Sequence, residues 1–127
     1  MEWFENDDFW RDFYPFMFAD ERFAATPDEV GRILALTQCS GGSVLDLCCG
    51  TGDMALALRN QGSDARITGA DFSHAMLTRA CAKTPAGARV TWIEADALHL
   101  PFDNNSFDLV TSAFGFRNLA DYDAGLR

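Results

Sequence analysis

Residues 43–53, SVLDLCCGTGD, place two glycines directly after a short apolar run. Gly50 and Gly52 allow the backbone to turn tightly and to approach a ligand closely, although glycines alone also occur in a plain strand-to-helix turn. Asp71 stands 21 residues after Gly50, at the end of the next apolar run. An acid at about that spacing accepts hydrogen bonds from ribose hydroxyls. The pattern predicts a site for a nucleoside-containing cofactor.

The charge of this turn indicates which kind of cofactor it accepts. A dinucleotide-binding turn has a third glycine, and position 55, where that glycine is expected, holds Ala55. Asp53 places negative charge at the start of the following helix, where a pyrophosphate would be repelled. A cationic cofactor fits this turn better than an anionic one.

The elements that must position these residues follow a regular alternation. Apolar runs rich in β-formers alternate with helix-forming segments, which predicts parallel strands joined by right-handed crossovers, with helices on both faces of the sheet. The predicted strands are residues 43–49, 66–72, 90–96 and 107–114.

Helix boundaries are indicated by capping residues. Thr26 with Glu29 forms a capping box, Pro27 suits the first helical position, and this helix is expected to end near residues 40–42. Ser73 is expected to open the helix that follows the second strand. Each helix therefore begins close to the turn that precedes it.

The first 29 residues differ from the rest, with nine acids against two arginines. Nine of the sixteen aromatic residues also precede Ala24. We predict an N-terminal helical cap over residues 1–25, with one or two short amphipathic helices, and a cofactor-binding domain over residues 26–127. The cap either covers the core or forms a substrate lid. The apolar positions at helical spacing, interrupted by Pro15, are Trp10, Phe13, Met17 and Phe18.

Composition limits the remaining classes of function. A chain of 127 residues, 48% hydrophobic, builds one core, and its net charge of −9 argues against nucleic acid as a partner. No apolar run approaches the roughly 20 residues that span a bilayer, and the acidic start is unlike a targeting peptide, so we expect a cytoplasmic protein with no membrane span. The cysteines lack C-x-x-C spacing and are read as reduced, structural thiols.

Four strings carry a resemblance to a known family: VLDLCCGTGD, GADFSHAML, VTWIEADALHLPFDNNSFDLV and FGFRNLAD. Together, over about residues 43–122, they resemble the class I S-adenosylmethionine-dependent methyltransferases, and specifically the C-methyltransferases of ubiquinone and menaquinone biosynthesis. The resemblance implies an α/β, Rossmann-like partial parallel sheet of order 3-2-1-4. It also implies S-adenosyl-L-methionine as cofactor and methyl transfer to a small-molecule acceptor, with C-methylation of a quinol-like ring as the specific reaction.

The resemblance also implies roles for individual residues. The acceptor would be oriented by Arg117 and Asn118. Independently of the resemblance, the general use of histidine as a base makes His99, in a loop near the predicted pocket, a weaker candidate base. One departure concerns the position before the FG dipeptide, where the family has serine and this chain has Ala113, with Ser112 beside it. The implied cofactor-binding residues are Asp46, Gly50, Thr51 and Gly52 around the methionine part, Asp71 at the ribose, and Phe72, Asp96 and Ala97 at the adenine.

The position where the chain ends suggests two further expectations. Family members continue through additional strands beyond Arg127, so we read the chain as an N-terminal part with an apolar edge at its fourth strand. A homodimer or larger assembly would cover that edge. The alternative function is a non-catalytic Rossmann-like binding or interaction module that pairs through the same edge.

Overall fold

A computed structural model describes residues 6–17, 24–113, 115 and 119–127, with the side chains of residues 13–17 left out. The described chain contains a four-stranded sheet in which all pairs are parallel and the order is β3-β2-β1-β4. This confirms the predicted fold class and strand order. The strands are β1 (Ser43–Leu47), β2 (Arg66–Asp71), β3 (Val90–Glu94) and β4 (Leu109–Thr111).

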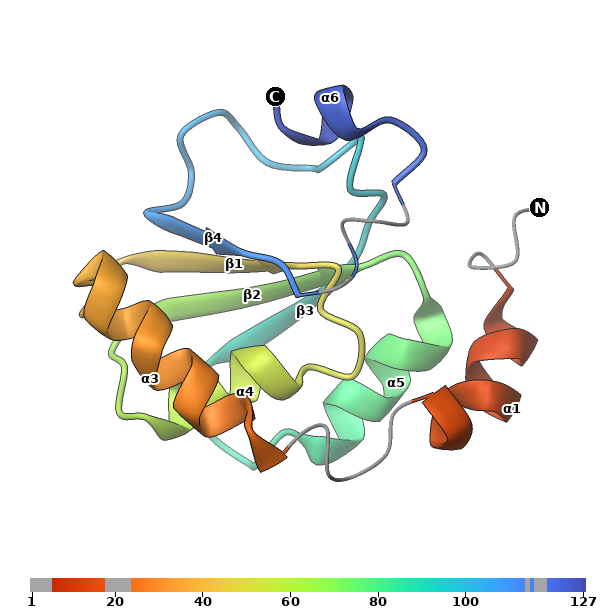
Figure 1. Cartoon of the computed structure of the whole chain (residues 1–127), viewed down its shortest axis with the longest axis horizontal. Helices are drawn as coiled ribbons and strands as arrows, with labels where there is room; N and C mark the ends of the chain where they lie inside the picture. Colours follow the sequence, from red (N-terminus) through yellow and green to blue (C-terminus); the bar gives the residue numbers. More distant parts are fainter. Residues whose placement is uncertain (1–5, 18–23, 114, 116–118) are drawn as a thin grey trace.

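Three helices cover one face of this sheet (Figure 1). They are α3 (Thr26–Thr37), α4 (Asp53–Asn60) and α5 (His74–Lys83). The central strand β1 is buried at every position, as expected for a parallel strand between two others. The core beneath α3 and α4 is a row of register neighbours from all four strands, namely Val44, Ile67, Val90 and Leu109.

The second face carries the loop of residues 95–108 and the short helix α6 (Tyr122–Gly125) in place of a full helical layer (Figure 1). Within the loop, Phe102 and Phe107 pack edge to face, with ring centroids 4.9 Å apart. Val110 on β4 is 54% exposed. Among the described strands β4 is therefore an edge with an apolar side chain in water, and the homodimer expected from that edge stays a prediction.

Helix α1 (Asp7–Met17) docks on α5 beside the sheet (Figure 1). Trp10 on α1 is buried, and its ring packs edge to face against Phe9. Pro15 was expected to interrupt the helix, and instead it lies inside α1. Because Pro15 has no N–H to donate to the carbonyl of Arg11, that oxygen is free to accept a hydrogen bond from the Arg79 guanidinium of α5, at 3.3 Å. Phe18, the last residue of the predicted stripe, lies outside the described residues.

The boundaries of α3 correct two predictions. The capping box does not form: Ala25 occupies the N-cap without a side-chain hydrogen bond, and Thr26 is buried inside the helix. The helix also ends at Thr37, before residues 40–42, because Gln38 adopts a left-handed conformation with φ 54°. Ser73, by contrast, caps α5 as predicted, accepting a hydrogen bond from the Met76 N–H.

The strands are shorter than predicted, and β4 most of all, with three residues against eight. Its pairing with β1 extends only from Val44 to Asp46. At the carboxyl end of β1, Cys48 takes a φ of 55°, which turns the chain out of the sheet immediately after Leu47. The remaining described residues of the predicted strands lie in the loops that flank the observed strands.

One tryptophan explains the placement of two glycines. Trp92 on β3 extends its ring across β2, where an added Cβ at Gly69 would collide with it. The ring reaches the glycine turn, since a Cβ at Gly52 would also collide with it. Its indole N–H donates to the hydroxyl of Thr84 at 2.9 Å, which fixes the ring's orientation. Gly52 is therefore required for packing as well as for any approach of a ligand.

We expect Gly52→Ala to lower the free energy of unfolding by about 1–3 kcal/mol more than Gly62→Ala does. Both glycines have positive φ, 82° and 79°, so the conformational cost of a Cβ is matched. Only the Cβ at Gly52 meets the Trp92 ring, whereas the Cβ at Gly62 meets nothing within 4 Å. Urea unfolding of both variants measures the difference, and equal losses would contradict the packing role of Gly52.

Candidate functional site

The glycine turn after β1 is bent by three left-handed residues in five positions. Cys48, Gly50 and Gly52 have φ of 55°, 57° and 82°. The turn stays attached to the sheet because the Cys49 N–H donates to the Ala70 carbonyl at 3.0 Å. The Gly52 N–H then closes the turn on the Cys49 carbonyl at 2.9 Å. The sequence indicated the two glycines, and nothing in it indicated that Cys48 shares their conformation.

Asp71, at the end of β2, holds this turn directly. Its Oδ2 accepts a hydrogen bond from the Gly50 N–H at 2.9 Å, and its Oδ1 accepts one from the Ser73 N–H at 2.9 Å. Burial raises the pKa of Asp71, and these backbone hydrogen bonds oppose the rise. A carboxylate has about four lone-pair sites, so each oxygen retains capacity for a ligand hydroxyl. The predicted ribose acid is thus also the anchor of the glycine turn.

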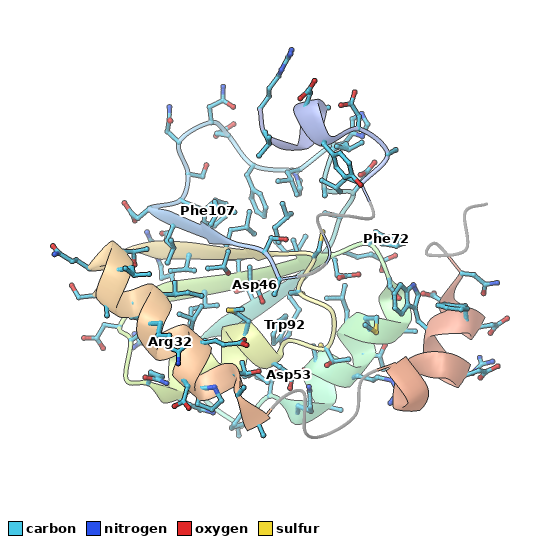
Figure 2. All side chains as sticks on the ribbon, in the orientation of Figure 1. Arg32, Asp46, Asp53, Phe72, Trp92 and Phe107 are labelled. Carbon is cyan, nitrogen blue, oxygen red and sulfur yellow. The ribbon has the colours of Figure 1, made fainter. Side chains whose placement is uncertain are left out.

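Asp46, in the middle of the sheet, is the most buried acid of the site, at 1% exposure. Figure 2 shows it within the sheet. Its Oδ1 accepts a hydrogen bond from the Thr111 hydroxyl of β4 at 3.1 Å, and Oδ2 has no hydrogen-bond partner among the described residues. Burial raises the pKa of Asp46 to about 7, although the hydrogen bond from Thr111 acts to lower it.

Three predicted site acids act together on the turn. Burial, together with the charges of Asp71, Asp46 and Asp96, raises the pKa of the Cys48 thiol to about 12. Burial and the first two of these acids also raise the pKa of the Cys49 thiol. All four cysteines of the chain are free, as the sequence predicted. The carboxyl ends of β1, β2 and β3 therefore create a negative potential around the turn.

The adenine-side residues follow β2 and β3. Asp96 is exposed, and its carboxylate accepts from the Leu98 N–H and pairs with His99 Nδ1, both at 2.9 Å. The hydrogen bond from His99 lowers the pKa of Asp96. Ala97 lies within this turn and is half-buried, as is Phe72. Figure 2 places Phe72 at the carboxyl end of β2, where α5 begins.

Thr51 and Asp53 belong to a polar cluster that sequence reasoning missed. The Thr51 hydroxyl donates to Asp53 Oδ2 at 2.7 Å, and Lys83 Nζ donates to Thr51 Oγ1 and to Asp53 Oδ1, both at 2.9 Å. Asp53 is thus paired with the Lys83 cation. Because the two charges offset each other, the charge of Asp53 favours a cationic cofactor less than the sequence indicated. Lys83 stands at the far end of α5, and no motif links it to the turn.

The segment predicted to meet the acceptor reaches the same turn. Gly115 lies so close to Cys48 that an added Cβ would collide with the cysteine side chain. Ser112 and Ala113, the positions that depart from the family pattern, follow β4 directly. Arg117 and Asn118, the two predicted catalytic residues, lie outside the described residues.

Other surface features stand apart from this site. A groove of about 340 Å³ lies at the opposite edge of the sheet, between the amino ends of the strands and Phe107. Across residues 6–17, 24–113, 115 and 119–127 there is no cluster of metal-binding side chains and no helix with the length and apolarity to cross a membrane. The glycine turn and its acids are therefore the candidate functional site.

The comparison with family models decides the family. The model of the ubiE/COQ5 methyltransferase family matches residues 27–127. The chain belongs to this family. This is a methyltransferase family, which confirms the family resemblance drawn from the sequence.

Two curated relatives are demethylmenaquinone methyltransferases. The chain is 52% identical over 84 residues to that of Thermus thermophilus and 46% identical over 88 residues to that of Staphylococcus epidermidis. These matches cover 65% and 68% of this chain but only 38% and 36% of the relatives. The chain thus spans little more than a third of the length of the curated relatives that it matches.

Solved structures support the fold. An S-adenosylmethionine-dependent methyltransferase from Clostridium acetobutylicum matches 94% of this chain with 48% of its own, at a TM-score of 0.69 and 23% identity. Magnesium protoporphyrin IX methyltransferase from Synechocystis, solved with bound S-adenosylmethionine, matches 80% of this chain with 49% of its own, at a TM-score of 0.64 and 22% identity. At these identities the likeness establishes the shared architecture.

Burial of Asp46 predicts an unusual pH dependence of stability. Because the folded chain keeps the Asp46 proton up to a pH of about 7, whereas the unfolded chain loses it near 3.8, the free energy of unfolding falls as pH rises through this window. Asp46→Asn removes this decline, which is on the order of 2–4 kcal/mol, while the amide oxygen still accepts from Thr111. Denaturant unfolding at pH 5 and pH 8 tests this prediction. An equal change in the free energy of unfolding between the two pH values in the unaltered chain and in Asp46→Asn would contradict it.

Proposed function

We propose that this chain binds S-adenosyl-L-methionine at the carboxyl ends of β1, β2 and β3 and takes part in methyl transfer to a small-molecule acceptor. The observation that supports it best is the left-handed glycine turn after β1, which Asp71 at the end of β2 holds through the hydrogen bond from the Gly50 N–H. Open α/β sheets bind ligands at this edge. The acids there favour a ligand that carries positive charge.

The residues fit the cofactor part by part in this proposal. The turn of Gly50, Thr51 and Gly52, with Asp46 beneath it, holds the methionine part. Asp71, which keeps free lone pairs beside its hydrogen bonds to the turn, accepts the ribose hydroxyls. Phe72 packs against the adenine, and Asp96 with Ala97 borders it.

The bound cofactor supplies an electrophilic methyl group on a sulfonium. The chain's own contribution is to align the acceptor with that methyl group and to assist loss of a proton from the acceptor. The raised thiol pKa values also matter here, because Cys48 and Cys49 stay protonated and so are poor nucleophiles toward a methyl donor.

For the acceptor we propose a quinol-like ring that is methylated on carbon. The named relatives act on demethylmenaquinone, and the FGFRN string resembles their branch of the family. Arg117 would stabilise the phenolate-like oxygen beside the reacting ring carbon, and Asn118 would orient the ring. The cytoplasmic location, the homodimer and the division at residue 25 remain predictions alongside this one.

The proposal is tested by calorimetric titration with S-adenosylhomocysteine. We expect the chain to bind this product and Asp71→Ala to bind it roughly 10- to 150-fold more weakly, the equivalent of about 1.5–3 kcal/mol. Absence of binding by the unaltered chain would favour the alternative, an interaction module that pairs through β4.

Asp71→Ala also removes the anchor of the glycine turn, so it needs a control that lowers stability alone. Ser73→Ala serves, because it removes the hydroxyl that caps α5 and leaves the Asp71 carboxylate in place. We expect Ser73→Ala to lower the melting temperature and to keep the affinity. Equal losses of affinity in both variants would refute the ribose assignment.

The acceptor role of Arg117 gives a separate kinetic prediction. In a protein that methylates the acceptor, Arg117→Ala is expected to lower the methylation rate about 10-fold or more and to change the affinity for S-adenosylhomocysteine less than twofold. Methylation rates at saturating cofactor measure the first effect, and calorimetric titration with S-adenosylhomocysteine measures the second. Parallel losses in both would indicate a structural arginine.

A further inference from the structure

Lys83 is the only lysine in the chain. It ends α5, and its side chain, 38% exposed, reaches the glycine turn that follows β1. There Nζ lies 2.9 Å from both the Thr51 hydroxyl and Asp53 Oδ1. A lysine is long and flexible, so holding it in one geometry costs side-chain entropy that these contacts must offset.

The cluster that Lys83 completes is largely shielded. Thr51 is only 4% exposed, and the Asp53 side chain is 28% exposed. The Thr51 hydroxyl donates to Asp53 Oδ2, so its oxygen is oriented to accept from Lys83. Removal of the Lys83 ammonium would take the cation away from Asp53. It would also take away the donor that faces the Thr51 oxygen.

Two residues that flank the body of α5, one before its start and one at its end, thus hold the glycine turn. Asp71, before α5, binds the Gly50 N–H, and Lys83, at the end of α5, binds Thr51 and Asp53. The two contacts lie on either side of the backbone bend between Gly50 and Asp53. A shift of that bend moves the atoms that the proposed function assigns to the methionine part of the cofactor.

We propose that Lys83 is a positioning residue for cofactor binding, acting through Thr51 and Asp53 on the geometry of the glycine turn. The inference rests on the proposed function, because it assigns Lys83 a role at the same site. The coupling between the two is reciprocal. If the Lys83 contacts raise the affinity for the cofactor, bound cofactor stabilises the Lys83 contacts by the same free energy.

The first test compares Lys83→Met with Lys83→Arg and with Arg32→Met, which removes one charge from an exposed position on α3. Calorimetry with S-adenosylhomocysteine is expected to show at least about fivefold weaker binding for Lys83→Met, less than twofold change for Arg32→Met, and partial recovery for Lys83→Arg. Thermal unfolding of each variant confirms that it is folded. Unchanged affinity in a folded Lys83→Met would overturn the proposal.

A double-mutant cycle separates action through Thr51 from a general loss of charge. If Lys83 acts through Thr51, Lys83→Met costs affinity in the unaltered chain and little more in a Thr51→Val background. Additive losses would overturn this route. If the unaltered chain fails to bind S-adenosylhomocysteine at all, the proposed function fails first, so the two failures are distinguishable.

The single lysine permits a third test, which needs no mutation. An acetylating reagent for amines has two targets in this chain, Lys83 and the N-terminal amine. Saturating S-adenosylhomocysteine is expected to slow acetylation of Lys83 about fivefold or more, while the N-terminal amine reacts at an unchanged rate and serves as the internal reference. Mass spectrometry of both positions over time measures the ratio, and an equal rate at Lys83 with and without S-adenosylhomocysteine would overturn the proposal.

Discussion

The hydrogen bond from the Gly50 N–H to the Asp71 carboxylate, 2.9 Å long, connects the two strands that build the site. It joins the turn after β1 to the end of β2, and its strength comes from a charged acceptor in a buried place. Cys48 can take its left-handed conformation because this contact and the ladder bond from Cys49 to Ala70 determine the path on either side. The shape of the ligand edge depends on this connection.

The same connection concentrates negative charge. Asp71 must be buried to hold the turn, and Asp46 pairs in register with Gly69, two residues before Asp71, so that the Asp71 charge helps to raise the pKa of Asp46. Both carboxylates have raised pKa values because burial disfavours their charged forms. A cationic ligand would relieve part of this electrostatic cost, which gives the site a physical reason to favour a sulfonium over a phosphate.

Much of the fold was predictable because its signals are local. Alternation of apolar runs with helical segments predicts parallel strands, and Ser73 predicts the start of α5 through a cap that involves neighbouring residues. The capping box at Thr26 failed because Thr26 is buried within α3, and burial depends on the packing of the whole domain. Helix α1 continues through Pro15, and a distant arginine binds the carbonyl that proline leaves free.

By itself the sequence determined the order of the strands, the glycine turn, the ribose acid and the family, because each depends on residues close together along the chain or on a motif. The tertiary structure alone decided that Trp92 packs against Gly52 and that Lys83 holds Thr51 and Asp53. It also decided that Thr111 donates to Asp46. These contacts join residues 30 to 65 positions apart, and the sequence between such residues carries no periodic signal that specifies which side chains meet.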